Sequence, residues 1–253
     1  MFNGLSFGTF QAEDMLLDNF TGRKTGLFQK NGMCVESVLF DLDGTLIDSV
    51  PVYFRMMEAI LKTIGLPPAP RSVVSEFMVR GMSAIEGLIP PEMKHRKEEI
   101  ALEFMATGKK IAQSMFRDEV QVFHGVSELF SLLMDLGIPI GIVTSTEREY
   151  LERKLAPLDR KGLKQCLSAV IGIEDAPRRK PAPDPLVECS RRLGVDPGKC
   201  IYVGDSHVDI VAGNAAGMTT VGVLTGLDDL EKLQKEGPGM IFESVNELSR
   251  LFR

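Results

Sequence analysis

Short apolar runs alternate along most of the chain with stretches in which apolar side chains recur every three or four positions. The apolar runs predict buried strands, and the three-to-four-residue repeats predict amphipathic helices. Strands that alternate with helices are typical of a parallel sheet covered by helices on both faces. The sequence therefore predicts an α/β fold with strands at residues 35–40, 138–143, 169–171, 200–203 and 219–223.

Helix signals lie between these runs. Segments 146–149 (Thr-Glu-Arg-Glu) and 244–247 (Ser-Val-Asn-Glu) have the form of capping boxes. Asp184 followed by a proline is a typical helix start, and Gly194 is a typical helix end. We expect helices at residues 126–136, from about 146, at 184–193, at 208–216 and from about 244.

Residues 51–121 break the alternation. They hold no convincing strand, and their apolar spacing predicts helices at 51–64, 71–79 and 91–116. We expect a helical cap domain at 51–121, inserted after the first strand of a core made of residues 33–50 and 122–253. Residues 1–32 show no clean period and no secretory leader, so we expect an accessory or loosely ordered N-terminal extension.

Composition narrows the class of protein. The 253 residues are 44% hydrophobic and 25% charged, as in ordinary globular proteins. No apolar run approaches the ~20 residues of a membrane span, and a net charge of −6 argues against a nucleic-acid partner. The four cysteines are far apart and the three histidines share no metal-ligand spacing, so neither zinc nor a disulfide framework is expected. Reduced thiols favour a cytoplasmic location.

The strongest chemical signal is Asp41-Leu42-Asp43-Gly44, directly after the first predicted strand. Residues two apart on a strand leave it on the same side, so the two carboxylates come close together. Close carboxylates repel, and a divalent cation removes that conflict. Mg²⁺ binds through one or two carboxylates together with water and phosphate oxygens. We therefore predict a Mg²⁺ site here; solvated acids in a plain turn are the alternative.

Three further motifs follow later strands, and each has an ordinary explanation when taken alone. Thr144 and Ser145 can hold a phosphate at a helix start, or act only as helix caps. Lys180, before a proline-rich loop, can neutralise a phosphoryl oxygen, or lie on the surface as most lysines do. Asp205 and Asp209 can complete a metal shell, with Asp209 binding a metal-bound water or orienting Lys180, or can cap a helix. Because the carboxyl ends of parallel strands meet at one crevice, the four motifs together predict one site.

With these motifs the chain resembles the haloacid dehalogenase-like hydrolase superfamily over about residues 35–225. The helical insertion resembles that family's C1 cap, and the loop around Lys180 is most similar to the phosphoglycolate phosphatase branch, with the β-phosphoglucomutases near it. The resemblance rests on Asp41-Leu42-Asp43-Gly44-Thr45 for the first motif, Thr144 for the second, Lys180 for the third, and Gly204-Asp205 with Asp209 for the fourth.

The resemblance implies a Rossmann-like core and Mg²⁺-dependent hydrolysis of a small phosphorylated metabolite. It makes Asp41 the nucleophile, which forms an aspartyl-phosphate, and Asp43 the acid and base. Asp41 and Asp205 become side-chain metal ligands, and Asp43 a ligand through its main-chain carbonyl. Thr144 and Lys180 hold and neutralise the phosphoryl group.

The sequence departs from the family pattern at several positions, and these departures bear on other possible functions. The main alternative to a phosphatase is a sugar phosphomutase of the β-phosphoglucomutase type, but Tyr53 stands where mutases usually carry a histidine. The presence of Asp43 disfavours a dehalogenase, and the complete motif set disfavours a role in binding alone. Arg80 resembles part of the cap's specificity loop and is a candidate for a second anionic group of the substrate, or an ordinary surface arginine. His124, where relatives often have proline, is interpreted as structural.

Overall fold

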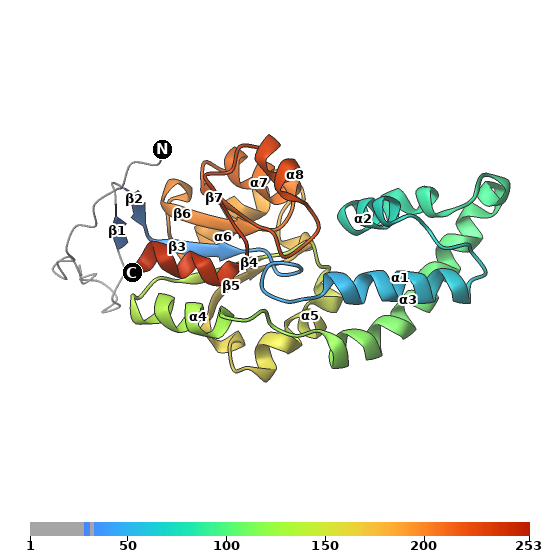
Figure 1. Ribbon diagram of the computed structural model, residues 1–253, viewed down its shortest axis with the longest axis horizontal. Helices are drawn as coiled ribbons and strands as arrows, with labels where there is room; N and C mark the ends of the chain where they lie inside the picture. The colour runs from blue at the N-terminus through green and yellow to red at the C-terminus, as the bar shows by residue number, and fades with distance from the viewer. Residues whose placement is uncertain (1–27, 31–32) are drawn as a thin grey trace.

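A six-stranded parallel sheet forms the centre of the molecule (Figure 1). The computed structural model describes residues 28–30 and 33–253. The strand order is β5-β4-β3-β6-β7-β8, and every neighbouring pair is parallel. The α/β fold expected from the sequence is confirmed. The strands are β3 (Ser37–Phe40), β4 (Ile140–Val143), β5 (Leu167–Ile171), β6 (Cys200–Gly204), β7 (Thr219–Val223) and β8 (Met240–Phe242).

Both faces of the sheet are buried. In β3, Val38 and Phe40 belong to one apolar layer and Leu39 belongs to the other. The first layer contains side chains of α4 (Val126–Asp135), α5 (Arg148–Arg160) and the C-terminal 3₁₀ helix (Val245–Phe252); the second contains side chains of α6 (Asp184–Leu193) and α7 (His207–Ala215). Figure 1 shows these groups on opposite sides of the sheet, with α8 (Leu230–Lys235) beside α7. Burial on both faces explains why the strands read as continuous apolar runs.

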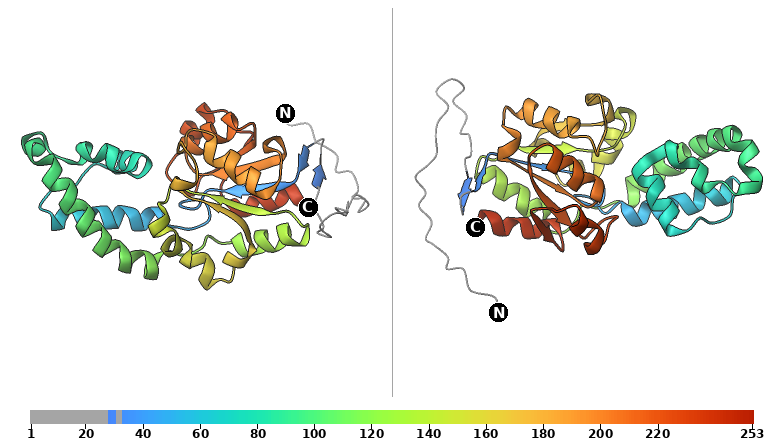
Figure 2. Two further views of the ribbon diagram at one scale, coloured as in Figure 1. Left: turned by 180° about the vertical axis from the view of Figure 1, so that it is seen from behind. Right: turned by 90° about the horizontal axis from the view of Figure 1, so that it is seen from above.

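Residues 50–119 form a helical unit between β3 and β4, called here the helical insertion. It comprises α1 (Val50–Thr63), α2 (Arg71–Arg80), two 3₁₀ helices (Gly81–Leu88 and Pro91–Arg96) and α3 (Lys97–Glu119). Phe77 of α2 packs edge-on against Phe104 of α3, with ring centroids 5.1 Å apart. Figures 1 and 2 show the insertion beyond the carboxyl end of β3, at the end of the molecule opposite the C-terminus. Residues 51 and 121 as domain boundaries stay a prediction.

The start of the chain differs from the expectation. The single strand predicted over 35–40 is divided into β2 (Met33–Val35), which pairs antiparallel with β1 (Phe28–Lys30), and β3. The division falls at Glu36, whose N–H donates to the Lys199 carbonyl (2.9 Å) and whose carboxylate binds the Lys199 ammonium (2.6 Å). The expected N-terminal extension over 1–32 lies outside the described residues, apart from β1.

Two predicted helix caps are wrong. Helix α5 begins at Arg148 without a side-chain cap, because the Thr146 hydroxyl instead shares a hydrogen bond with the Thr144 hydroxyl (2.9 Å). The segment from Ser244 is a 3₁₀ helix, and its first hydroxyl bonds the Asn246 side chain rather than the backbone. Strand β8 was not expected, since three residues are too short to give a pattern. Among the described helices, none is both long and apolar enough to cross a membrane.

Candidate active site

The order of the strands reverses between β3 and β6, which are neighbours in the sheet. An aspartate directly follows each of these two strands. Asp41 directly follows β3, and its N–H donates to the carbonyl of Val203 in β6 (2.8 Å). Asp205 directly follows β6. In open parallel sheets a reversal of strand order leaves a crevice at the carboxyl edge, where ligands bind. The fold therefore places these two carboxylates at the position where a ligand site is expected.

Lys180 lies at the centre of the acidic cluster. Its side chain is buried, and its Nζ donates to Asp41 Oδ1 (2.6 Å) and Asp209 Oδ1 (2.7 Å). It also contacts the Tyr202 hydroxyl (2.9 Å) and the carbonyl of Val143 at the end of β4 (3.1 Å). The ammonium thus joins groups from β3, β4, β6 and α7. Lys180 is buried, so the alternative that it lies on the surface as most lysines do is wrong.

Burial and mutual repulsion perturb the carboxyl groups. Burial, together with Asp209, raises the pKa of Asp41 to about 7, although Lys180 opposes this change. Burial and the nearby Asp41 and Asp209 raise the pKa of Asp205 well above its ordinary value. Burial alone would lower the pKa of Lys180, but Asp209 and Asp41 outweigh it and raise that pKa. Such shifts are frequent at functional sites.

The donor set fits a divalent cation. Asp41, Asp205 and Asp209 are all buried and offer carboxylate oxygens within 4.8 Å of one another. Two of the three, Asp41 and Asp209, pair with the single ammonium of Lys180, so this buried cluster holds more carboxyl groups than cations. Oxygen ligands of this kind suit Mg²⁺. The acidic cluster is therefore a candidate metal site.

Asp205 and Asp209, which follow β6, are held by hydrogen bonds from protein donors. Asp209 accepts from Tyr202 through Oδ1 (2.8 Å) and from the Ser206 hydroxyl through Oδ2 (2.6 Å), in a capping box at the start of α7. Asp205 accepts from the Thr45 hydroxyl through Oδ1 (3.2 Å) and from the Leu227 N–H through Oδ2 (2.8 Å). The orientation of each carboxylate is thus fixed before any ligand binds.

Asp43 makes an ion pair that the sequence did not suggest. Its Oδ1 lies 2.6 Å from Nζ of Lys154, a residue of α5 whose side chain is only 4% exposed. The Lys154 ammonium also lies over the rings of Tyr53 (4.3 Å) and Phe116 (4.0 Å), which belong to α1 and α3. Lys154 therefore joins the core, the helical insertion and Asp43. The cation–π contacts compensate a charge that has left water.

The residues after β4 lie beside the cluster. Thr144 is buried and its N–H donates to the carbonyl of Ile171 (2.9 Å), while Ser145 is exposed. Both line the same cavity as Asp41 and Lys180. The structure thus brings Thr144, Ser145 and Lys180 to the carboxylates, as the sequence predicted.

One cavity of about 670 Å³ reaches from the acidic cluster to the helical insertion. Its core side is lined by Asp41, Asp43, Lys180 and Asp205, and its far side by α1, α2 and α3. A volume of this order is typical of small-molecule sites. Gly81 lines it but, within the described lining, Arg80 does not; the Arg80 guanidinium is more than half exposed and binds Glu76 (2.7 Å). The structure does not bring Arg80 to the other predicted residues.

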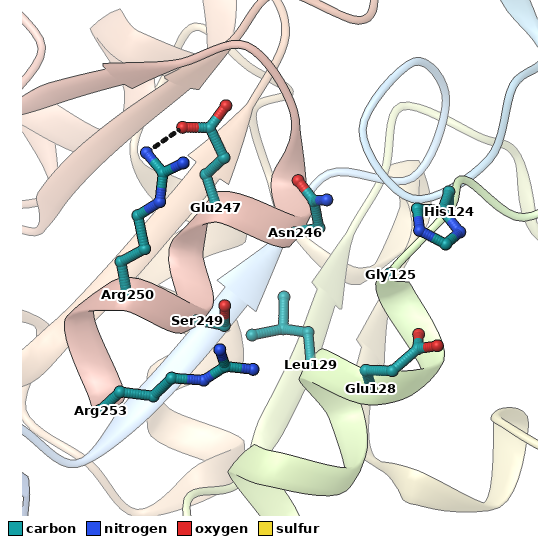
Figure 3. A pocket seen from close by; sticks show the side chains of 9 residues that line it. All are labelled: His124, Gly125, Glu128, Leu129, Asn246, Glu247, Ser249, Arg250 and Arg253. Atoms are coloured by element: carbon teal, nitrogen blue, oxygen red, sulfur yellow. Dashed lines mark hydrogen bonds and ion pairs between the residues drawn. The ribbon is translucent and has the colours of Figure 1, made fainter.

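His124 lines a different cavity, of about 320 Å³, between α4 and the C-terminal 3₁₀ helix. Figure 3 shows His124 and Glu128 on one side of it and the Arg250–Glu247 ion pair (2.6 Å) on the other. None of the four motifs contributes to this described lining. The interpretation of His124 as structural stays a prediction.

Comparisons with known proteins agree with this geometry. The family described as haloacid dehalogenase-like hydrolase matches residues 38–223. A phosphoglycolate phosphatase from Neisseria meningitidis is 34% identical over 221 residues, covering 85% of this chain and 92% of the relative. A crystal structure of a predicted phosphoglycolate phosphatase from Haemophilus somnus superposes with TM-score 0.73 at 22% identity, covering 87% of this chain and 98% of that one. A β-phosphoglucomutase from Clostridium difficile gives TM-score 0.68 at 20% identity, with coverages of 86% and 97%.

The two crystal structures show a shared fold, and the family match spans more than half of the chain. Phosphatases of this family hydrolyse phosphoric monoesters, and the acidic cluster of this chain could hold a metal ion. The chain therefore belongs to the haloacid dehalogenase-like hydrolase family and is a phosphatase within it.

Proposed function

We propose that this phosphatase hydrolyses a small phosphomonoester in two steps, with Asp41 as the nucleophile. The observation that carries the proposal is the contact of a buried Asp41 with Lys180, at the reversal of strand order and at the floor of the shared cavity. A carboxylate held there is an anion beside a fixed ammonium, and it can approach the phosphorus of a bound ester. Covalent catalysis of this kind splits one difficult displacement into two easier ones.

In the first step a carboxylate oxygen of Asp41 attacks phosphorus, and the ester P–O bond breaks. Asp43, in its protonated form, donates a proton to the leaving alkoxide, so a neutral alcohol departs and Asp43 is left as the carboxylate that pairs with Lys154. In the second step Asp43 takes a proton from water, whose oxygen attacks phosphorus and releases inorganic phosphate from Asp41. Lys180 and the Thr144 hydroxyl bind the phosphoryl oxygens and stabilise the charge that develops on them.

Mg²⁺, when bound, would neutralise phosphoryl oxygens and reduce the repulsion between substrate and carboxylates. We propose Asp41 and Asp205 as side-chain ligands and Asp43 as a ligand through its main-chain carbonyl. Asp209 binds the Lys180 ammonium directly, which Asp205 does not, so its proposed part is to hold Lys180 and to support the metal site from outside. The cytoplasmic location inferred from the separate cysteines also stays a prediction.

The test is phosphate release from a panel of phosphomonoesters, which includes phosphoglycolate, hexose phosphates, glycerol phosphates and mononucleotides. We expect turnover with Mg²⁺, loss of turnover with EDTA, and loss in Asp41→Asn despite an unchanged circular dichroism spectrum. Asp135→Asn changes an exposed aspartate on α4 and is the matched control. Equal activity in Asp41→Asn and Asp135→Asn would remove the nucleophile assignment.

A phosphomutase is not favoured by the surroundings of Tyr53. This residue lines the cavity, packs edge-on against Phe116 with ring centroids 4.9 Å apart, and lies under the Lys154 ammonium. Its ring is therefore part of a structural cluster where mutases usually carry a histidine. If the panel gave no phosphate while a sugar bisphosphate activated the conversion of β-glucose 1-phosphate, the mutase would replace the phosphatase.

A further inference from the structure

The helical insertion presents an apolar wall to the cavity. Five of the residues that line this wall are methionines: Met56, Met57, Met78, Met82 and Met105. Met82 is 37% exposed and Met105 is 55% exposed, although both face the active-site cavity. Exposed large apolar side chains that gather in a hollow mark a surface that an apolar ligand or partner covers. Methionine side chains are flexible and polarisable, and they adapt to the shape of such a ligand.

Most of the positive charges around the cavity already have an acidic partner. Lys180 and Lys154 form buried ion pairs with the catalytic carboxylates, at 2.6 Å in each case. Lys109, the only cation that the insertion contributes to the described lining, lies 3.6 Å from Glu149. A carboxylate on the leaving group would therefore lose hydration against a wall that is mostly apolar, where the one described cation is an exposed lysine that already lies near a carboxylate.

Arg153 of α5 is the remaining cation of the described lining, and it stands on the core side. Its guanidinium carbon lies 4.8 Å from the centre of the Tyr150 ring, and its Nε is buried without a hydrogen-bond partner. This donor suits one oxygen of the substrate, neutral or anionic, on the core side of the cavity, and it leaves the apolar wall of the insertion to contact the rest of the molecule.

We propose that the substrate of this phosphatase is a phosphomonoester of an alcohol with an extended apolar body, which packs against the methionine wall of the insertion. This inference rests on the proposed phosphatase function and names the substrate class of the same site. The phosphoryl group lies at Asp41 and Lys180, and the apolar body extends toward Met82 and Met105. A two-carbon acid would leave most of the 670 Å³ cavity and its apolar wall without contacts.

The experiment compares kcat/KM for a series of n-alkyl phosphates from ethyl to hexyl, with phosphoglycolate beside them. The alkyl esters have leaving alcohols of nearly equal reactivity, so the series isolates the binding of the alkyl chain. We expect kcat/KM to rise by about fourfold for each methylene that becomes buried. We also expect butyl phosphate to exceed phosphoglycolate.

Two methionine-to-lysine substitutions test whether the preference for longer alkyl chains arises at the cavity wall. Met105→Lys places a charge on the cavity wall, whereas Met134→Lys places the same charge on α4, at a methionine of almost equal exposure (54% against 55%) that does not line the cavity. We expect Met105→Lys to reduce the ratio of hexyl to ethyl phosphate hydrolysis by tenfold or more, a fold-change that about two methylenes would supply. Met134→Lys leaves the ratio unchanged.

A flat alkyl series, equal ratios in the two variants, or a higher kcat/KM for phosphoglycolate than for butyl phosphate would each overturn the inference. In all three outcomes the hydrolysis of ethyl phosphate or phosphoglycolate would still support the phosphatase. Failure of every ester to release phosphate would instead overturn the proposed function, and the inference with it. The two failures are therefore distinguishable in one set of assays.

Discussion

Lys180 and Lys154 are the two residues around which the active site is organised. Each is a buried lysine paired with a motif aspartate at 2.6 Å, Lys180 with Asp41 and Lys154 with Asp43. A buried ammonium fixes the position of its carboxylate more firmly than a surface ion pair does, because removal of one partner leaves an uncompensated buried charge. The proposed nucleophile and the proposed acid are thus each held by a cation from a different part of the core.

A double-mutant cycle tests the positioning role of Lys154. We expect Lys154→Met to lower kcat for alkyl phosphates by about tenfold or more, since a positioned general acid contributes ~10²–10⁴ to rate. The loss should be smaller for p-nitrophenyl phosphate, whose leaving group needs little protonation. In an Asp43→Asn background, Lys154→Met should have almost no further effect.

Lys154→Arg, which keeps the charge, is the control for that cycle. Steady-state kinetics and thermal unfolding of all variants separate catalysis from stability. A purely structural role for Lys154 predicts equal losses for alkyl and aryl esters, and the same loss whether Asp43 is present or not; that result would contradict the positioning role.

At the scale of secondary-structure elements, the loop after β7 closes over Asp205. The Leu227 N–H binds Asp205 Oδ2, and a Cβ built on Gly226 would lie 1.7 Å from the same oxygen. Gly44, in the turn after Asp43, has φ +82°, and its Cβ would lie 2.6 Å from Asp205 Oδ2. Two backbone segments therefore approach the carboxylate of Asp205, a proposed metal ligand, at distances that only glycine allows.

Gly226→Ala tests this arrangement. The added methyl group must displace Asp205, so we expect the affinity for Mg²⁺ or Mn²⁺, measured by isothermal titration calorimetry, to fall by about tenfold or more. Gly87→Ala, whose Cβ would meet only the Val73 side chain at 3.4 Å, is the matched control and should bind the metal as the native protein does. Native metal affinity in Gly226→Ala would show that Asp205 is not a ligand.

The same elements show what the sequence could and could not predict. The four strand-end motifs were predictable because a parallel sheet brings the ends of distant strands to one edge. The contact of Lys154 with Asp43 was not predictable, because the two residues lie 111 positions apart. A lysine on an amphipathic helix also indicates a charge that faces solvent. The role of Tyr202 was not predictable either, because in the sequence it is one of several apolar residues of β6. Its hydroxyl nevertheless binds Lys180 and Asp209.

For the whole molecule, the acidic cluster couples stability to pH and to metal. The pKa of Asp41 is raised from its ordinary value to about 7 in the folded protein, mainly by burial. Between pH 4 and pH 7, roughly, the folded state therefore holds a proton that the unfolded state has lost, and the free energy of unfolding falls as pH rises through this window. A divalent cation binds the deprotonated form and opposes that fall.

We therefore expect Mg²⁺ to raise the melting temperature more at about pH 7.5 than at about pH 5, as measured by thermal unfolding in EDTA and in excess Mg²⁺. Asp41→Asn removes one of the two carboxyl groups with a raised pKa, and in EDTA its melting temperature should fall less between these pH values than that of the native protein. An equal effect of Mg²⁺ at both pH values, together with an unchanged slope in Asp41→Asn, would contradict the coupling.

If a phosphoryl group passes through Asp41, the aspartyl-phosphate intermediate can be trapped during turnover. Borohydride reduces an acyl phosphate to an alcohol, so an aspartyl-phosphate trapped during turnover becomes homoserine, which peptide mass spectrometry locates. We predict homoserine at position 41 only when substrate and Mg²⁺ are both present, and at no other aspartate. Steady phosphate release with an unmodified Asp41, or with homoserine at Asp43 or Asp205, would contradict the account.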